Sequence, residues 1–239
     1  MIYELIVEVP NASELARTDN EAFAMVRRRG FGASDSSVLL NVNPFPDGTM
    51  EKLLEQKRSR FITAEEMAIG QNVNVRKGAD LEYLILDKFI KKFNVAPQLI
   101  NKPSEMFRIG GTALTVNYDA IMEVKPFRIP VECKYVSPYA GKYYNFTKSI
   151  RDVLKMEGTL ANLGTEVNNL YLNKRAEEAG IPIYYYTQIQ QQMMGLNAPF
   201  AYLTVLVDKT WEIETFLVQA DPQVHQKLLE VSTKAWELV

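Results

Sequence analysis

Two adjoining segments with strand-like patterning constrain the fold more than any other feature of this sequence. Residues 112–124 and 127–136 are rich in β-branched and aromatic residues, and Lys125-Pro126 between them is typical of a turn. A long helical pattern over 63–93 precedes them, and further helical patterns follow. Helices on both sides of a strand-rich centre predict an α/β fold with a central mixed β-sheet.

The remaining patterns extend this order of elements along the chain. We expect further strands at 2–8, 105–110, 200–207 and 211–218, and further helices at 11–29, 49–57, 184–196 and 221–238. The polar stretch 141–180 predicts a helical insertion. Because no repeat or long linker divides the sequence, we expect a single domain over residues 1–239.

Cysteine and histidine each occur once, as Cys133 and His225. One cysteine excludes an intramolecular disulfide and any cysteine-held zinc or iron–sulfur site, and one histidine excludes a multi-histidine metal site. We expect Cys133 to be a buried small hydrophobic residue and His225 to lie at the surface or an interface. Enzyme chemistry in this chain would therefore come from carboxylates, lysines, amides and a hard metal ion.

The charge balance neither favours nor excludes a nucleic-acid partner. The 239 residues hold 27 Lys or Arg and 29 Asp or Glu, a formal net charge of −2, and charge can still be segregated onto one face. The first residues lack a signal-peptide pattern, and no apolar run is long enough for a membrane span. We expect a soluble protein of a reducing cytoplasm, with no membrane partner.

The strongest chemical pattern combines Asp119 with Glu132-Cys133-Lys134. Residues two apart in a strand face the same side, so Glu132 and Lys134 should project together. A turn at Lys125-Pro126 pairs residues whose numbers sum to about 251, which would bring Asp119 opposite Glu132 with Cβ atoms ~5 Å apart. Two such carboxylates repel unless a cation lies between them, and oxygen ligands suit Mg²⁺ or Mn²⁺.

Glu-x-Lys alone carries little information, because the sequence contains it three times. Glu55-Gln56-Lys57 lies in an expected helix, where positions i and i+2 diverge. Glu123-Val124-Lys125 lies too far along the strand from Asp119 to share an ion with it. Only Glu132-Cys133-Lys134 satisfies the geometry, and a surface ion-pair ladder remains the alternative interpretation.

Three further features accompany this pattern in order along the chain: the acid Glu82 on the long helix; basic and hydroxyl side chains from Arg27 to Ser36; and Gln188-Ile189-Gln190 after an aromatic run. As an ordered set, they resemble the phage-type alkaline exonucleases, namely the YqaJ-like viral recombinases and lambda exonuclease. The resemblance covers roughly residues 25–207. It implies the restriction-endonuclease-like fold of the PD-(D/E)xK nucleases.

The resemblance implies a role for each matching residue. Asp119 and Glu132 would bind the metal together with the Cys133 carbonyl, and Lys134 would position or activate the attacking water. Glu82 would support the metal or water, and Gln188 would close the site.

The residues implied in DNA or 5′-phosphate binding are Arg27, Arg28, Ser34 and Lys142. Arg27 fits the register best among Arg27-Arg28-Arg29, for which a solvated helix end is the alternative. The family's proline before the first acid is Tyr118 here.

The implied activity is Mg²⁺-dependent hydrolysis of linear duplex DNA from 5′ ends, leaving 3′ overhangs for recombination by strand annealing. Mn²⁺ would substitute, and two ions per site are implied. Implied partners are DNA ends, a single-strand annealing protein and further copies of the chain in a trimer. Two alternatives remain open at this point. They are a structure- or site-specific endonuclease on the same fold and a non-catalytic DNA-binding module.

Overall fold

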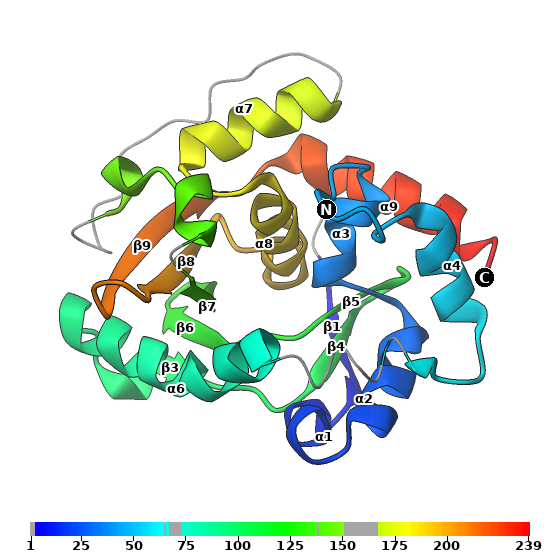
Figure 1. Cartoon of the computed structure of the whole chain (residues 1–239), viewed down its shortest axis with the longest axis horizontal. Helices are drawn as coiled ribbons and strands as arrows, with labels where there is room; N and C mark the ends of the chain where they lie inside the picture. Colours follow the sequence, from blue (N-terminus) through cyan, green and yellow to red (C-terminus); the bar gives the residue numbers. More distant parts are fainter. Residues whose placement is uncertain (1–2, 65, 67–72, 138, 151–166) are drawn as a thin grey trace.

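The computed structural model describes residues 3–64, 66, 73–137, 139–150 and 167–239. The strands form two mixed sheets, one in the order β1-β4-β5-β2 and the other in the order β3-β6-β7-β8-β9 (Figure 1). β2 runs parallel to β5, β7 runs parallel to β8, and the other pairs are antiparallel. The strands are β1 (Leu5–Val9), β2 (Phe31–Gly32), β3 (Ile100–Asn101), β4 (Met106–Ile109), β5 (Leu114–Val116), β6 (Ala120–Val124), β7 (Phe127–Val136), β8 (Phe200–Val207) and β9 (Glu212–Gln219).

The helices surround these sheets, which confirms the α/β class. The α-helices are α1 (Ala12–Thr18), α2 (Asn20–Val26), α3 (Ser36–Leu39), α4 (Met50–Arg58), α6 (Val73–Phe93), α7 (Asn169–Ala179), α8 (Ile183–Leu196) and α9 (Pro222–Trp236). Short 3-10 helices span Arg27–Arg29, Ala33–Asp35, Pro97–Leu99, Ala140–Tyr143 and Phe146–Lys148. None of the helices in the described residues is both long and apolar enough to cross a membrane.

The hairpin of β6 and β7 has the predicted register. Ala120 pairs with Val131 and Val124 pairs with Phe127, so the turn falls at Lys125-Pro126 as expected. The prediction of one continuous strand over 112–124 is wrong, because β5 and β6 belong to different sheets. The segment between them contains Tyr118, whose buried hydroxyl donates a hydrogen bond to the Gln192 carbonyl of α8 at 3.1 Å. Tyr118 is held toward α8 between the two strands, and β5 and β6 lie in two separate sheets, where the sequence predicted one central sheet.

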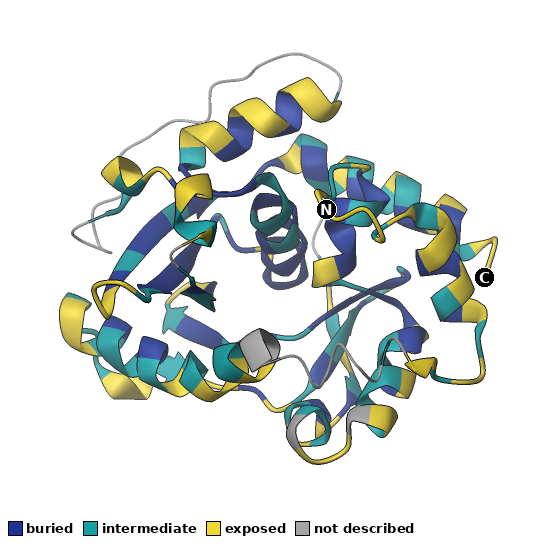
Figure 2. Ribbon diagram, in the orientation of Figure 1, coloured by how far each residue is buried: buried dark blue, intermediate teal, exposed yellow. Residues whose placement is uncertain are grey.

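Two helices cover opposite faces of the five-stranded sheet. α6 contacts β7, β8 and β9, and the ring of its residue Phe89 lies 5.8 Å from that of Tyr202 on β8. α8 contacts β7 and β8 on the other face and also contacts β4 and β5, so it lies between the two sheets. Figure 2 shows the consequence, since α8 is almost wholly buried while α6 and α7 expose one face each. The core therefore continues from one sheet to the other through α8.

The α8 backbone approaches the segment between β5 and β6 very closely. At Gly195, a Cβ atom would lie 2.6 Å from the Tyr118 hydroxyl and 3.1 Å from Leu5 Cδ2. Real Cβ atoms do not approach other atoms at the first of these distances. Only glycine fits here, and the close packing brings the polar face of α8 against the strand ends.

The helix expected over 11–29 is divided at Asp19 into α1, α2 and the 3-10 helix Arg27–Arg29. The cause is local, because the Asp19 side chain accepts a hydrogen bond from the Ala22 backbone N–H at 2.9 Å and caps α2. Such capping starts a new helix and ends the preceding one. The new direction of α2 brings Phe23 and the following Arg27 to the lining of a pocket.

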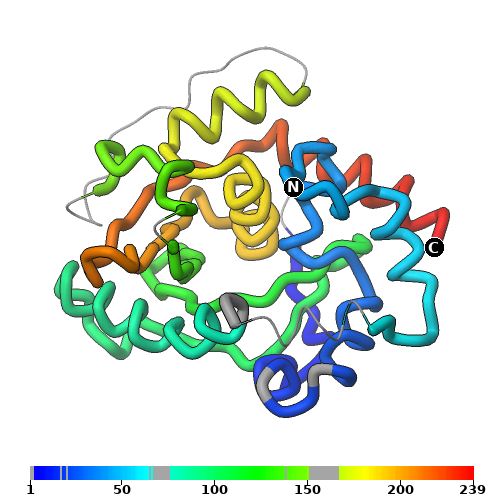
Figure 3. Tube along the Cα trace, viewed as in Figure 1, coloured from blue at the N-terminus to red at the C-terminus, as the bar shows by residue number. Residues whose placement is uncertain are grey.

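Segments far apart in the sequence also pack together, as the trace in Figure 3 shows for α3 and α9. Phe31 and Trp236 meet there edge to face, with ring centroids 5.4 Å apart. His225 on α9 is half-buried and hydrogen-bonded to Gln190 of α8 at 3.0 Å, so it is not a freely exposed surface residue. Of the expected insertion over 141–180, residues 151–166 lie outside the described residues, and α7 forms its last part.

Candidate active site

The end of the β6–β7 hairpin gathers the acids and the lysine of the sequence pattern. Asp119 Oδ2 accepts a hydrogen bond from the Cys133 backbone N–H at 2.8 Å and lies 4.0 Å from Lys134 Nζ. Lys134 also donates a hydrogen bond to Glu132 Oε1. Glu132 and Lys134 thus share one face of β7 with Asp119 beside them. Cys133 is buried, as the sequence predicted, and burial raises the pKa of its thiol well above the ordinary value.

Helix α8 contributes two amides that hold the Glu132 carboxylate. Gln188 Nε2 donates to Glu132 Oε1. Gln192 Nε2 donates to Glu132 Oε2 at 2.6 Å and to the Asn117 carbonyl at 3.2 Å. Gln188 was predicted from the sequence, but Gln192 was not. The available signal was the spacing of four residues, which places both side chains on one face of a helix.

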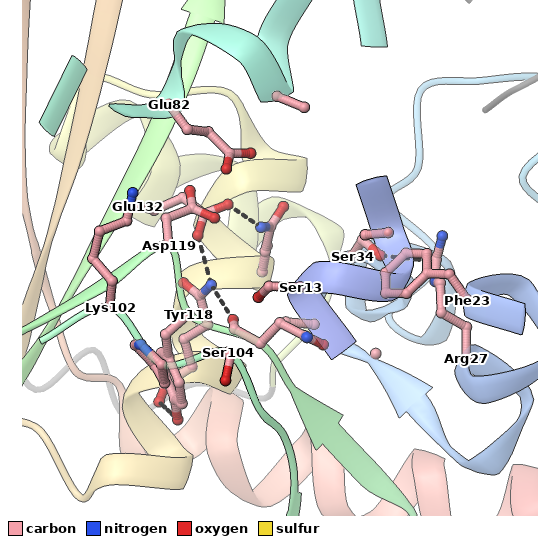
Figure 4. Close-up of a pocket in the computed structure, with 18 of the residues that line it drawn as sticks. Ser13, Phe23, Arg27, Ser34, Glu82, Lys102, Ser104, Tyr118, Asp119 and Glu132 are labelled. Atoms are coloured by element: carbon pink, nitrogen blue, oxygen red, sulfur yellow. Dashed lines mark hydrogen bonds between the residues drawn. The ribbon is translucent and has the colours of Figure 1, made fainter. Parts of the chain in front are cut away.

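Glu82 approaches Asp119 and Glu132 from α6 (Figure 4). Burial raises the pKa of Asp119 well above its ordinary value, and the charges of Glu132 and Glu82 raise it further, while Lys134 acts in the opposite direction. Three acids facing one lysine leave the site with an excess of negative charge. Carboxylates under such mutual repulsion favour the binding of a cation.

Lys134 is held in its charged form. Burial alone would lower the pKa of its ammonium, but Glu132 and Asp119 keep that pKa well above the ordinary value. The Tyr185 ring lies 5.8 Å from Lys134 Nζ and bounds its position from the α8 side. A protonated Lys134 can donate hydrogen bonds and stabilise negative charge, but in this form it cannot accept a proton.

A pocket of about 630 Å³ joins this acidic cluster to a basic end. Its two ends are visible in Figure 4, with Glu82, Asp119 and Glu132 on one side and Arg27 and Ser34 on the other. Further polar residues that line the pocket come from α1, α8, and the segments before β4 and between β5 and β6. They include Ser13, Glu14, Lys102, Ser104, Asn117 and Gln192.

The basic end contains some of the residues predicted to bind phosphate and lacks others. Arg27 Nη2 donates to the exposed Ser34 hydroxyl at 2.9 Å, and both residues line the pocket. Arg28 does not line it, because its buried guanidinium is ion-paired with Glu66 at 2.8 Å. Lys142 does not line it either, and its ammonium lies 3.9 Å from the centre of the Tyr139 ring. The structure therefore places Arg28 and Lys142 outside the basic end of this pocket.

The donor set fits a hard divalent cation chemically. Asp119, Glu132 and Glu82 offer carboxylate oxygens, which Mg²⁺ and Mn²⁺ prefer. Within the residues that the structure describes, no three acidic, imidazole or thiol groups are already drawn together as a metal cluster. Lys134, Gln188 and Gln192 instead satisfy the Glu132 oxygens. Binding an ion through Glu132 would replace part of this hydrogen bonding.

Comparison with known families identifies the chain. The model of the YqaJ-like viral recombinase domain matches residues 22–195, which is well over half of the sequence. The chain belongs to the YqaJ-like family. The resemblance drawn from the ordered motifs is thereby confirmed. A comparison with curated proteins finds no match.

Solved structures confirm the fold of this YqaJ-like chain. LHK-Exo in complex with dAMP has a TM-score of 0.57 and 14% identity, covering 91% of this chain and 92% of that chain. The alkaline exonuclease LHK-Exo from Laribacter hongkongensis has a TM-score of 0.51 and 12% identity, covering 92% of this chain and 95% of that chain. A phage-related exonuclease from Haemophilus somnus 129PT has a TM-score of 0.52 and 11% identity, covering 86% of this chain and 91% of that chain. At these identities the likeness concerns the fold.

Proposed function

We propose that this chain is a Mg²⁺-dependent exonuclease that hydrolyses one strand of linear duplex DNA from its 5′ end and leaves a 3′ overhang. The observation that carries the proposal is the meeting of Asp119, Glu132 and Lys134 at the end of one hairpin, inside a pocket with a basic far end. Family membership and the exonuclease folds of the structural neighbours support the same reaction class.

Asp119, Glu132 and the Cys133 carbonyl would hold the ion, with Glu82 close to them. A divalent cation bound there supplies Lewis-acid stabilisation of the charge on the scissile phosphate. Family membership favours two ions per site, with Mn²⁺ able to replace Mg²⁺. Because oxygen donors and excess negative charge are both present, the residues suit such an ion without any histidine or cysteine ligand.

The side chains around the acids would divide the remaining work. Lys134, being protonated, would orient the attacking water and donate to a phosphoryl oxygen as negative charge develops there. Gln188 and Gln192 would fix the Glu132 carboxylate, and Glu82 would accept a hydrogen bond from the water. As long as Lys134 stays protonated, it acts as an electrostatic and positioning group, and a carboxylate would accept the proton of the water.

The basic end would select the DNA terminus. Arg27 and Ser34 offer a guanidinium and a hydroxyl at the far side of the pocket from the acids, a combination that suits a terminal 5′-phosphate. A deoxynucleotide is bound in one of the structural neighbours, LHK-Exo in complex with dAMP. Sequence-independent contacts to the DNA backbone would hold the duplex. A trimer of this chain and a single-strand annealing partner are part of the same proposal, as is action in the cytoplasm of a phage host.

Linear duplexes labelled at one 5′ or one 3′ end, with or without a 5′-phosphate, test the proposal in Mg²⁺. We expect early release of the 5′ label, faster digestion of phosphorylated ends, and no attack on closed circular DNA. Nicking of the circle would instead assign an endonuclease. Absence of any digestion, together with intact duplex binding, would assign a non-catalytic DNA-binding module.

A further inference from the structure

A buried ion pair stands directly behind the basic end of the pocket. Lys57 on α4 and Asp35 after β2 are 2.8 Å apart, with side chains only 1% and 9% exposed. Lys57 Nζ also donates to the Arg27 carbonyl at 2.8 Å. Asp35 Oδ1 accepts from Arg27 Nη2 at 3.3 Å, so the pair touches both the backbone and the guanidinium of Arg27.

The charges of these groups decide what the pocket offers to an anion. Arg27 is 41% exposed on its side chain, and an ion pair with Asp35 alone would cancel its charge. Lys57 cancels the charge of Asp35 instead and leaves one net positive charge on the three groups. The nearby Arg28 does not alter this balance, because Glu66 pairs with it. A buried lysine thus restores the cationic character that Asp35 would otherwise remove.

The hydrogen bonds of Asp35 show why the acid is present at all. Its Oδ2 atom accepts from the Gly32 backbone N–H at 2.9 Å and from Lys57, while Oδ1 reaches Arg27. Asp35 therefore fixes the Arg27 guanidinium beside the Ser34 hydroxyl. The Lys57 and Arg27 charges together hold the pKa of Asp35 below its ordinary value against the opposing effect of burial, so the carboxylate stays ionised.

We propose that Lys57 is a positioning residue for recognition of the DNA 5′-phosphate, because its charge offsets that of Asp35 and leaves the Arg27 guanidinium cationic and correctly placed. This inference rests on the proposed function, since it assigns how the same pocket selects its substrate end. Lys57 contacts neither the acids of the hairpin nor the pocket itself, so it acts through Arg27 and Asp35.

The test compares digestion of duplexes with 5′-phosphate and 5′-hydroxyl ends, and reports the ratio of their kcat/KM values. Lys57→Met should lower that ratio about tenfold, as expected when a charge-assisted contact is lost, mostly through a higher KM for the phosphorylated end. Lys57→Gln keeps an N–H donor but no charge, and should lower the ratio similarly. Lys52→Met, on the exposed side of the same helix, is the matched control and should leave the ratio unchanged.

The double variant Asp35→Asn/Lys57→Met removes both buried charges and leaves the Arg27 charge uncancelled. It should recover most of the preference lost by Lys57→Met, an outcome that a merely structural role for Lys57 would not produce. If Lys57→Met does not fold, the double variant can still be used to measure the 5′-phosphate preference, because it contains no uncompensated buried charge. Melting curves of all variants identify any that are unfolded.

Two results would overturn this inference. One is an unchanged preference in folded Lys57→Met or Lys57→Gln, and the other is complete loss of preference in the double variant. Failure of the proposed function looks different, because the wild-type protein would then digest neither kind of end. Wild-type digestion that ignores the 5′-phosphate would remove both the end-selection role of Arg27 and the role of Lys57 behind it.

Discussion

The Asp119 carboxylate accepts a hydrogen bond from the Cys133 backbone N–H at 2.8 Å. This bond joins the segment that carries the first acid to the strand that carries Glu132 and Lys134. The bonded oxygen is Oδ2, and Asp119 also lines the pocket. The local backbone of β7 therefore sets the position of one acid relative to the other.

Asp119→Asn should weaken divalent-cation binding while keeping the fold. The amide retains an acceptor for the Cys133 N–H but removes one negative charge from the cluster, so we expect Mn²⁺ affinity to fall by at least about tenfold. Titration calorimetry with Mn²⁺ measures this directly, with Glu123→Gln on the exposed part of β6 as control. Equal Mn²⁺ affinity in Asp119→Asn and wild type would refute the ligand assignment.

Gln192→Leu should reduce hydrolysis about 10- to 100-fold, because the Glu132 carboxylate would lose the donor that fixes its second oxygen. Initial rates on linear duplex DNA measure the effect. Gln190→Leu is a matched control on the same helix, since its side chain bonds to Asp221 and Gln219 away from the acids. That control should lower stability with little change in kcat. Similar kcat values for both variants would argue against a role for Gln192.

Gly195→Ala should destabilise the protein by about 1–3 kcal/mol, because the new Cβ atom would overlap the Tyr118 hydroxyl. Urea unfolding measures the change. Tyr118→Phe removes the hydroxyl and its hydrogen bond to Gln192, at a cost of about 1 kcal/mol. In the Gly195→Ala/Tyr118→Phe double variant much of the overlap is relieved, so its loss should be smaller than the sum of the two single losses. If the two single losses of unfolding free energy simply added in the double variant, the contact between residue 195 and the Tyr118 hydroxyl would not be the cause of the destabilisation.

Acid should weaken the fold through His225. Burial lowers the pKa of its imidazole from the ordinary 6.5 to about 4, although Asp221 acts in the opposite direction. The unfolded chain then binds more protons than the folded one between these values, so the free energy of unfolding falls as pH drops through this window. The histidine contributes roughly 1–3 kcal/mol of this loss. Urea unfolding at pH 7 and pH 5 should show a smaller loss for His225→Gln than for wild type, and equal losses would contradict the assignment.

The sequence predicted the features that depend on local rules. The turn at Lys125-Pro126 fixed the β6–β7 register, because pairing continues outward from a tight turn. Thr63 and Glu66 form a capping box, a pattern readable from their spacing of three residues, with backbone-to-side-chain hydrogen bonds at 2.8 and 3.2 Å. Such contacts involve residues close in sequence, and their geometry follows from the residue types.

Features that depend on distant partners could not be predicted. Arg27, Arg28 and Arg29 look alike in sequence, but successive residues of a 3-10 helix point about 120° apart. Arg27 therefore lines the pocket, while Arg28 pairs with Glu66, which lies 38 residues further along the chain. Lys57 belongs to a Glu-x-Lys pattern whose helical position does not suit metal binding, and only the fold reveals its contact with Asp35.

The nuclease centre is tested most directly by Mg²⁺-dependent release of nucleotides from linear duplex DNA by wild type and Lys134→Ala. Lys125→Ala is the matched control, because Lys125 is the exposed lysine of the other Glu-x-Lys pattern in the same hairpin. We predict that chelation of the metal stops release by wild type, that Lys134→Ala loses at least about 100-fold in rate while remaining folded, and that Lys125→Ala stays active. Undiminished release by Lys134→Ala, or release that persists after chelation, would contradict the account.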